Sequence, residues 1–437
     1  MSVDRDGRRW ANRRVTVVGL GKSGMAAAEL LVRAGCRVSV TDSQEHPRLR
    51  GAASALSSLG VDTVELGGHS QRLVEGSDVL VVSPGVSEAS RPVQWAMASG
   101  VPILSEIELA FQFCPSPVIA VTGTNGKSSV VTLIERIVRA SGRSAIACGN
   151  LGLPFSAVVG RLTSDTMAIV EVSSFQLAWC VTFRPKIAVL LNLGTNHLDR
   201  HGHRDDYVQT KARLFRHQTP EDWAVLNGRD ETIIALDGQV GARRIWFGDN
   251  RTNPPWAFLS PQTLTALSEN AQAVLQVGRL LGIPDVLVWQ TLRASRGLEH
   301  RLEHLTSRRG ITFINDSKST TPESLLFALR QLSGSVVLIL GGRDKGLDFH
   351  PLAEACRAER VKGVILIGES RQRLRQLLNG TAHVHECRTL EEAVQHATAL
   401  AQAGDTVLFS PACASFDMFE SFEARGRAFK ALVHRLK

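Results

Sequence analysis

The sequence predicts an α/β protein with mostly parallel sheets, divided into three domains. Short apolar runs rich in Val and Ile alternate along the chain with longer segments in which apolar residues recur at helical spacing. Two glycine-containing loops, at residues 19–24 and 122–128, each stand between such a run and such a helix. Strands that alternate with helices pair in parallel, because each helix carries the chain back to the same edge of the sheet.

Composition is typical of a globular protein with about three domains of ordinary size. The chain has 437 residues, of which 43% are hydrophobic and 5% aromatic, and a formal net charge of +8. The basic residues are scattered without a run of five or more, which favours a solvated surface over a nucleic-acid site. We therefore expect no nucleic-acid partner, although anionic small substrates fit the charge.

Cysteine usage and the chain start predict a cytoplasmic protein. Seven cysteines, an odd number without a Cys-x-x-Cys pair, argue against a disulfide framework and against a structural zinc site. Residues 1–10 are charged rather than apolar, and no stretch reaches 18 apolar residues. We therefore expect neither a signal peptide nor a membrane span.

Residues 1–112 have the pattern of a nucleotide-binding domain. Apolar runs at 15–18, 38–40 and 79–82 predict strands, and residues 25–34 predict a helix. Residues 19–24 read Gly-Leu-Gly-Lys-Ser-Gly, and Asp42 follows the next strand. A Gly-x-Gly-x-x-Gly loop with an acid about 20 residues on is typical of Rossmann-type dinucleotide sites, although the loop would cradle any nucleotide diphosphate. Ser83-Pro-Gly85 ends a further strand, either as an ordinary turn or as a ligand contact.

A second domain begins after the proline-containing connector at 114–117 and opens with a phosphate loop. A strand leads into Thr-Gly-Thr-Asn-Gly-Lys-Ser at 122–128, and a helix follows. Backbone N–H groups of such a loop bind phosphate oxygens, Lys127 would reach the β- and γ-phosphates, and Ser128 would hold Mg²⁺. The usual P-loop glycine is replaced by Val121. The alternative is a tight turn with an exposed lysine.

Later apolar runs predict the remaining strands of two sheets. The runs at 145–148, 167–172, 187–191 and 223–226 belong to the second domain, which ends with helices at 271–281 and 287–292. Ligands lie beyond the carboxyl ends of parallel strands, where Glu171 and His197 are placed. A third series follows at 312–314, 336–340, 364–367 and 407–409. We therefore expect domains at 1–112, 113–299 and 300–437.

Five dispersed motifs resemble those of the Mur ligase family in order and spacing. They are Thr-Gly-Thr-Asn-Gly-Lys-Ser at 122–128, Glu-Val-Ser-Ser-Phe-Gln-Leu at 171–177, Asn-His-Leu-Asp at 196–199, Gly-Leu-Glu-His-Arg at 297–301 and Asn-Asp-Ser-Lys at 315–318. The resemblance covers nearly the whole chain. The short 19–24 loop, Ser83-Pro-Gly85 and the stretch 408–426 resemble the branch that adds D-glutamate.

This resemblance implies an ATP-dependent amide ligase of peptidoglycan precursor synthesis. ATP would phosphorylate the carboxylate of UDP-N-acetylmuramoyl-L-alanine, and the amine of D-glutamate would then displace the phosphate. The implied parts are an N-terminal Rossmann-like UDP-binding domain, a central P-loop ATPase-type domain and a C-terminal Rossmann-like glutamate-binding domain. Two Mg²⁺ sites are implied, and we expect a monomer.

The resemblance also implies roles for individual residues. The catalytic and metal-binding centre would consist of Lys127, Ser128, Glu171, His197 and Lys211, with Lys211 matching a lysine that the family carbamylates to N6-carboxylysine. The adenine nucleotide would contact Gly123, Thr124, Asn125, Gly126, Lys127, Ser128, Ser129, Asn270, Arg301, Asp316 and Lys318. The UDP substrate and glutamate would contact Gly21, Lys22, Ser23, Asp42, Ser83, Pro84, Gly85, Asn150, Ser173, Thr320, Lys345, Ser415 and Phe422.

Three positions depart from the family pattern. Gln44 stands where the D-glutamate branch often has an Arg, which bears on the uracil contact. Leu267 stands where an Asn usually precedes Asn270, which bears on the adenine contact. Thr195 stands where an acid is frequent.

Three alternative functions stay open. A related Mur-type ligase or a folylpolyglutamate synthetase would add a different amino acid, although the 410–422 stretch favours the D-glutamate branch. A NAD-dependent dehydrogenase would use the 19–24 loop and Asp42, but it leaves the other two domains without a purpose. A non-catalytic nucleotide-binding regulator would not need Lys127, Glu171 and His197.

Overall fold

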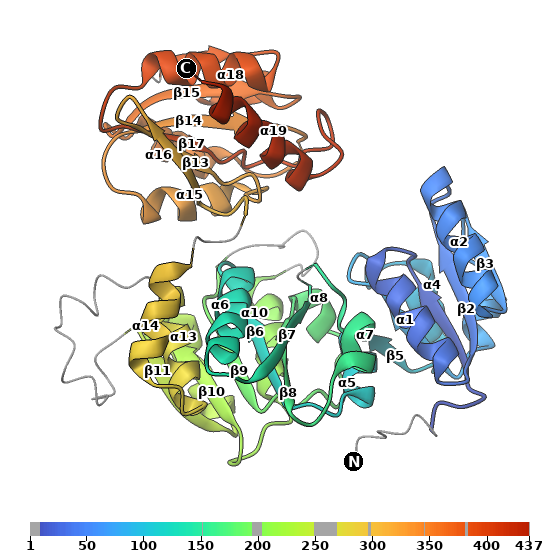
Figure 1. The fold of residues 1–437 in the computed structure, drawn as a ribbon. Helices are drawn as coiled ribbons and strands as arrows, with labels where there is room; N and C mark the ends of the chain where they lie inside the picture. The colour runs from blue at the N-terminus through green and yellow to red at the C-terminus, as the bar shows by residue number, and fades with distance from the viewer. Residues whose placement is uncertain are drawn as a thin grey trace. The chain divides into compact units, whose positions relative to one another are not determined.

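The computed structural model describes residues 9–150, 152–194, 203–248, 269–295, 299–344, 346–380 and 383–436. The chain forms two compact units, Met1–Arg293 and Ala294–Lys437. The first unit contains two parallel sheets and the second contains one mixed sheet (Figure 1). The predicted α/β class is confirmed. Within the described ranges, none of the helices combines the length and apolar content that a membrane span needs.

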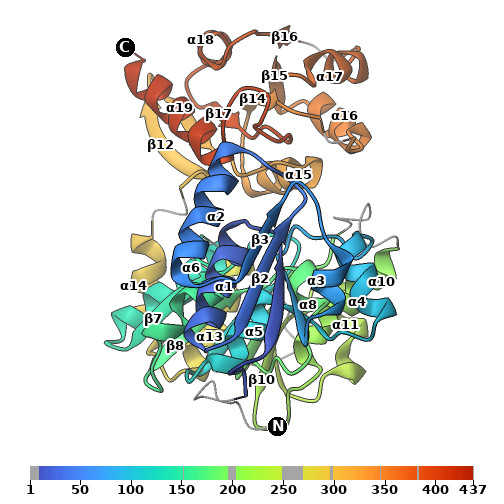
Figure 2. The ribbon, with the colours of Figure 1, turned by 90° about the vertical axis from the view of Figure 1, so that its right-hand side faces the viewer.

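The first sheet has five parallel strands in the order β3-β2-β1-β4-β5. The elements are β1 (Arg14–Val18), α1 (Lys22–Arg33), β2 (Arg37–Asp42), α2 (Pro47–Leu59), β3 (Thr63–Leu66), α3 (Gln71–Glu75), β4 (Val79–Val82), α4 (Arg91–Ala98), β5 (Ile103–Ser105) and α5 (Glu106–Phe113). Val15 and Val17 pack in the core that α1 and α2 cover, whereas Val18 packs in the core of α3 and α4 (Figure 2). Chain order reverses between β1 and β4, and sheets of this kind bind ligands at that point.

The second sheet has six parallel strands in the order β11-β10-β9-β6-β8-β7. Its elements are β6 (Val118–Thr122), α6 (Lys127–Ala140), β7 (Ser144–Gly149), α7 (Phe155–Val158), η1 (Val159–Arg161), β8 (Thr166–Glu171), α8 (Ser174–Leu177), β9 (Ile187–Leu190), α10 (Arg204–Ala212), η2 (Arg213–Phe215), β10 (Trp223–Asn227), α11 (Glu231–Ala235), η3 (Asp237–Gln239), β11 (Arg243–Phe247), α13 (Glu269–Leu280) and α14 (Asp285–Ala294). Because β6 lies between β8 and β9, the phosphate loop and Glu171 share one edge of the sheet.

The third sheet has the order β12-β13-β17-β14-β15-β16, with β12 antiparallel to β13 and the other pairs parallel. Its elements are β12 (Glu303–Arg308), β13 (Ile311–Asn315), α15 (Pro322–Gln331), β14 (Val336–Gly341), α16 (His350–Arg357), β15 (Val361–Ile367), α17 (Arg371–Leu377), β16 (Val384–Glu386), α18 (Leu390–Leu400), β17 (Thr406–Phe409) and α19 (Phe422–Arg435). The neighbouring strands β13, β17 and β14 therefore bring the loops after residues 315, 409 and 341 to one edge.

Five strands are absent from the prediction, namely β3, β5, β11, β12 and β16. Each of them lies at an edge of its sheet, as does β7, which was predicted. Edge strands have a neighbour on one side only, and four of these five contain exposed or half-buried residues, whereas β5 is buried but only three residues long. β12, for example, reads Glu-His-Leu-Thr-Ser-Arg and has no fully buried residue.

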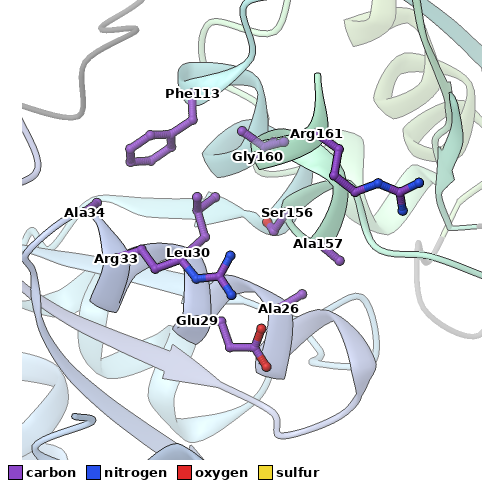
Figure 3. A pocket seen from close by; sticks show the side chains of 11 residues that line it. Ala26, Glu29, Leu30, Arg33, Ala34, Phe113, Ser156, Ala157, Gly160 and Arg161 are labelled. Atoms are coloured by element: carbon purple, nitrogen blue, oxygen red, sulfur yellow. The ribbon is translucent and has the colours of Figure 1, made fainter. Parts of the chain in front are cut away.

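A pocket of about 470 Å³ lies between α1 and the α7–η1 segment (Figure 3). Glu29 and Arg33 line it from α1, and Ser156 and Arg161 line it from the other side. The residues of α1 that line the pocket lie between Ala26 and Arg33, whereas the 19–24 loop precedes and begins that helix. It is therefore separate from the predicted nucleotide loops.

Candidate active site

The loop between β6 and α6 has the backbone geometry of a phosphate cradle. Gly123 and Gly126 have φ of 151° and 85°, a region that side chains disfavour. A Cβ on Gly126 would lie 2.4 Å from Oδ1 of Asn270, so Asn270 of α13 packs directly against the loop. The amides at the start of α6 have no earlier helical carbonyl to bind, and amides at such a helix start are the groups that bind phosphate oxygens.

Lys127 is the first residue of α6, and its side chain folds back over the loop. Its Nζ donates hydrogen bonds to the carbonyl oxygens of Gly123 and Thr124, both at 2.9 Å. A phosphate would offer this ammonium charged acceptors, which form stronger hydrogen bonds than neutral carbonyls.

Glu171 ends β8 and joins two other predicted site residues. Its Oε2 accepts a hydrogen bond from Oγ of Ser128 at 2.6 Å, and its Oε1 accepts one from Nδ2 of Asn150 at 2.9 Å. The residue is only 3% exposed. The carboxylate and the hydroxyl are hard oxygen ligands at the phosphate loop, and this donor set fits Mg²⁺.

Lys211 of α10 is buried beside the same loop. Its Nζ donates to the carbonyl oxygen of Gly123 at 3.1 Å and to Oγ1 of Thr122 at 3.2 Å. Burial lowers the pKa of Lys211 well below its usual value, and the charge of Lys127 lowers it further, whereas Glu171 opposes the shift. Among the described residues no carboxylate reaches ion-pair distance of this amine. The site therefore favours a neutral lysine, which is a nucleophile.

Two residues outside the predicted site hold the loop in place. Oδ1 of Asn192 accepts a hydrogen bond from the backbone N–H of Asn125 at 2.8 Å. The hydroxyl of Tyr207 lies 2.9 Å from Oγ1 of Thr124, and burial raises the pKa of Tyr207 to about 12. Asn192 follows β9 at the same edge of the sheet as the loop, and Tyr207 precedes Lys211 by one helical turn. Strand-end position and helical spacing are therefore the sequence features that could have identified them.

Predicted contacts for the UDP substrate gather at the carboxyl end of the first sheet. Oδ2 of Asp42 accepts a hydrogen bond from the N–H of Leu20 at 2.7 Å, and Oγ of Ser83 donates to the carbonyl of Gly19 at 2.8 Å. The 19–24 loop is therefore fixed both from β2 and from the segment after β4. Gly21 and Lys22, at the start of α1, are exposed.

The remaining three of these contacts lie beside this loop. Ser23 is the second residue of α1 and is half-buried. Pro84 is half-buried and Gly85 is exposed in the turn after β4.

In the second unit, Asp316 follows β13 and is 1% exposed. Its Oδ1 accepts a hydrogen bond from the N–H of Leu302 at 3.1 Å, and its Oδ2 accepts one from Oγ of Ser410 at 2.8 Å. Burial raises the pKa of Asp316, and Arg301 opposes the shift. Asp316 therefore ties the loops after β13 and β17 together.

Arg425 of α19 joins the same two loops and is also buried. Its guanidinium donates to the carbonyl oxygens of Ser317 at 2.8 Å, Cys413 at 3.0 Å and Ala414 at 3.1 Å. Burial lowers the pKa of Arg425 to about 10. Arg425 lies in the stretch 408–426 that resembles the D-glutamate branch, but the sequence analysis gave it no role. Its burial could not be predicted from that stretch.

Three family models match the chain in order. "Mur ligase MurD-like, N-terminal domain" matches residues 13–105, "Mur ligase middle domain" matches 121–273, and "Mur ligase, glutamate ligase domain" matches 300–413. The chain is 38% identical to a UDP-N-acetylmuramoylalanine–D-glutamate ligase of Desulfosudis oleivorans, over 98% of this chain and 97% of the relative. The chain belongs to the Mur ligase family. A second relative of that name, from Pelotomaculum thermopropionicum, is also 38% identical and matches over 98% of this chain and 99% of its own length.

Solved Mur ligases share the fold. The MurF ligase of Thermotoga maritima in complex with ADP has a TM-score of 0.60 at 16% identity, covering 98% of this chain and 97% of that one. The MurC ligase of Thermotoga maritima has a TM-score of 0.58 at 17% identity, covering 98% and 100%. These likenesses confirm the predicted architecture.

Not every residue that the Mur ligase resemblance implied can be placed. His197, Lys345 and the departures Thr195 and Leu267 lie outside the described residues. In the described part, the Ser128–Asn150–Glu171 cluster and the two lysines Lys127 and Lys211 meet at the phosphate loop.

Other predicted residues serve local structure as well. The hydroxyl of Ser173 caps α8 and bonds to Oε1 of Gln176 at 2.9 Å. Nζ of Lys318 lies 5.9 Å from the ring centroid of Phe422, at the start of α19. Thr320 is half-buried before α15, Ser415 is buried in the loop after β17, and Ser129 lies in the first turn of α6.

Proposed function

We propose that this chain is an ATP-dependent amide ligase that adds D-glutamate to UDP-N-acetylmuramoyl-L-alanine in peptidoglycan precursor synthesis. Membership of the Mur ligase family and the D-glutamate ligases among its relatives support this reaction. The structural observation that carries the proposal is the meeting of Lys127, Glu171 and Lys211 at one phosphate loop. A dehydrogenase or a passive nucleotide-binding protein has no need of that combination.

The reaction has two steps. A substrate carboxylate oxygen attacks the γ-phosphorus of ATP, and the bond to the β–γ bridging oxygen breaks, which releases ADP and leaves an acyl phosphate. The amine nitrogen of D-glutamate then attacks the acyl carbon, the C–O bond to phosphate breaks, and the amine loses a proton. The products are an amide, ADP and inorganic phosphate.

In the first step the carboxylate and the γ-phosphate repel each other, because both are anions. Cations in the site are therefore needed to neutralise their charge. We propose that Lys127 exchanges its loop carbonyls for phosphate oxygens when ATP binds. Ser128 and Glu171 would hold Mg²⁺, with His197 at a second site, and bound Mg²⁺ would neutralise phosphate charge. Asn150 would orient Glu171 through the amide hydrogen bond at 2.9 Å.

Lys211 is proposed to act as N6-carboxylysine. Its neutral amine nitrogen would add to CO₂, one proton would leave, and the product would be a carbamate anion. That change turns a buried amine near Lys127 and Glu171 into a carbamate, whose oxygens are ligands for Mg²⁺. Its two contacts to Thr122 and Gly123 would orient the new group.

Substrate roles in the outer domains are also proposals. The UDP moiety is placed against residues 21–23, Asp42 and 83–85, at the switch point of the first sheet. Arg301, Asp316, Lys318 and Asn270 are placed around the adenine nucleotide, and Thr320, Lys345, Ser415 and Phe422 around D-glutamate. We retain 1–112, 113–299 and 300–437 as the domain boundaries.

We further propose that the protein works as a monomer in the cytoplasm without a nucleic-acid partner. All seven cysteines lie in described segments, and none of them forms a disulfide. Six of the seven are buried. Free thiols of this number suit a reducing compartment.

Phosphate release from ATP tests the proposal. We expect release to require both UDP-N-acetylmuramoyl-L-alanine and D-glutamate, and a panel of other amino acids, including L-glutamate, to give background rates. Equal release with another amino acid would point to a different ligase. A change in reduced-cofactor absorbance with NAD would instead revive the dehydrogenase.

A further inference from the structure

His69 lies at the carboxyl end of the first sheet, in the loop after β3. This loop is tied to the loop after β2, because the N–H groups of Gly67 and Gly68 donate to the carbonyls of Gln44 and Asp42, each at 3.2 Å. In the sheet order β3-β2-β1, β3 and the 19–24 loop are on opposite sides of β2. His69 is therefore beside Asp42, on the side away from the glycine loop.

Hydrogen bonds to Thr41 determine which nitrogen of His69 carries the proton. Thr41 is 1% exposed, and its hydroxyl donates its single proton to the carbonyl of Gly68 at 3.0 Å. Nδ1 of His69 lies 2.8 Å from the same hydroxyl oxygen. Both contacts are hydrogen bonds only if Nδ1 carries a proton and donates it to Thr41. In the neutral ring, Nε2 is then a hydrogen-bond acceptor.

The surroundings favour the neutral ring. Burial lowers the pKa of His69, whereas Asp42 and Glu65 oppose the shift. Glu65 is engaged elsewhere, since its two oxygens accept from the N–H and hydroxyl of Ser70 at 3.0 and 2.6 Å. Within the part of the chain that the structure describes, Nε2 makes no hydrogen bond, and His69 is half-exposed.

Strand order matches the order of groups in a uridine diphosphate. The pyrophosphate binds at the start of the helix after β1, and an acid after β2 binds the ribose in folds of this kind. The base then extends toward the next strand, which is β3 here. The loop that carries His69 is therefore where a nucleotide base would lie.

We propose that Nε2 of His69 accepts a hydrogen bond from N3–H of uracil and so selects uridine over cytidine nucleotides. Uracil in a nucleotide has this one N–H donor, whereas N3 of cytosine carries a lone pair that faces the Nε2 lone pair unfavourably. His69 would thus supply a contact to the base in a chain that has Gln44 where the D-glutamate branch often has an arginine. The inference rests on the proposed function in placing the UDP substrate on the first domain.

Binding of UDP and CDP to the full chain tests this inference directly. Calorimetry with the adenine nucleotide site filled by a non-hydrolysable ATP analogue excludes binding of either probe there. We expect wild type to prefer UDP by about tenfold, because a site loses affinity when its hydrogen-bond acceptor faces a group without a donor. His69→Ala should weaken UDP binding by about tenfold and bring the UDP/CDP ratio close to one.

A second variant separates base recognition from general damage. The amide of His69→Gln can present either its oxygen to uracil or its nitrogen to cytosine, so UDP binding should be largely kept while CDP binding improves. The matched control is Gln71→Ala, two residues on, whose side chain bonds to Glu75 of its own helix. We expect it to leave both affinities unchanged.

Kinetics add a readout that a purely structural role would not give. His69→Ala should raise KM for the UDP substrate and leave kcat within about twofold, because uracil is remote from the reacting atoms. A UDP/CDP ratio that stays at the wild-type value in His69→Ala would overturn the role of His69 alone. No UDP binding by wild type would overturn the placement of the substrate as well.

Discussion

At the scale of single residues, the chemistry depends on charges that the protein places close together. Lys127 and Lys211 both bond to the carbonyl of Gly123, so two lysines share one acceptor. Two ammonium groups in such a position repel each other unless one is neutral or modified. Burial lowers the pKa of Lys211 well below its usual value, which favours the neutral amine, and the neutral amine is the form that adds to CO₂.

The role of Lys211 can be tested by chemical rescue. Lys211→Ala should lower kcat by about a hundredfold if Lys211 is the proposed carbamate, because the variant would lack that Mg²⁺ ligand. A short carboxylate such as formate or acetate should restore part of the activity by filling the vacated space. Lys186→Ala is the matched control, since Lys186 bonds to the carbonyl of Glu221 at the surface of the same sheet. Failure of every carboxylate across a wide concentration range would contradict the carbamate.

At the scale of elements, the glycines at the two ends of α6 differ in how closely other residues pack against them. Gly126 precedes the helix with φ 85°, and Gly142 follows it with φ 82°. A Cβ on Gly126 would meet Asn270 at 2.4 Å, whereas a Cβ on Gly142 would meet nothing within 4 Å. The first glycine is therefore needed for both backbone conformation and close packing, and the second for conformation alone.

This difference predicts unequal effects of the same substitution. Gly142→Ala should cost about 1 kcal/mol of stability from backbone strain and leave kcat unchanged. Gly126→Ala should cost more and should also raise KM for ATP, because Asn270 and the phosphate loop must move apart. Thermal unfolding and ATP titrations measure the two effects. Equal stability and equal KM for the two variants would show that Asn270 does not restrict the loop.

At the scale of the whole molecule, a buried acid links α5, the helix that follows the first sheet, to α7, the helix that follows β7 of the second sheet. Glu106 of α5 is 1% exposed, and its Oε1 accepts from the N–H of Ser156 at 2.6 Å. Its Oε2 has no hydrogen-bond partner among the described residues. Burial raises the pKa of Glu106 from 4.5 to about 7, although the N–H of Ser156 opposes the shift.

Stability should therefore depend on pH through Glu106. Between about pH 4.5 and 7 the native state binds a proton that the unfolded chain has released, so the free energy of unfolding falls as pH rises. A pKa near 7 in the native state, rather than 4.5 in the unfolded chain, corresponds to about 3 kcal/mol. The free energy of unfolding should therefore be lower by this amount above pH 7 than below pH 4.5. Glu106→Gln has no proton to lose, so its Tm relative to wild type should rise from pH 5 to pH 8.

Glu108 on the same helix is the control for this prediction. Its carboxylate accepts from the N–H groups of Val181, Thr182 and Phe183 at 3.0–3.1 Å. An amide nitrogen in Glu108→Gln would face those donors, so this variant should lower Tm at every pH. A Tm difference for Glu106→Gln that does not change with pH would contradict the shifted pKa.

Strand prediction from the sequence succeeded in the sheet interiors and missed β3, β5, β11, β12 and β16 at the edges, although it found the edge strand β7. β1, β4, β6, β9, β14 and β17 are buried on both faces, and their Val- and Ile-rich runs identify them. β3 and β12 are half-exposed, and only pairing with a neighbour makes them strands. Pairing is a property of the tertiary structure, so local patterns do not contain it.

The sequence by itself determined the fold class, the two glycine loops and most of the residues that meet at the phosphate loop. Lys127, Ser128 and Glu171 could be identified because parallel strands end at one edge and ligands bind there. Only the tertiary structure decided that Lys211 is buried against Gly123, that Arg425 ties two loops together, and that Nδ1 of His69 lies 2.8 Å from the hydroxyl of Thr41. Burial and hydrogen-bond partners set the charge and tautomer of a side chain, and they arise from contacts between residues distant in sequence.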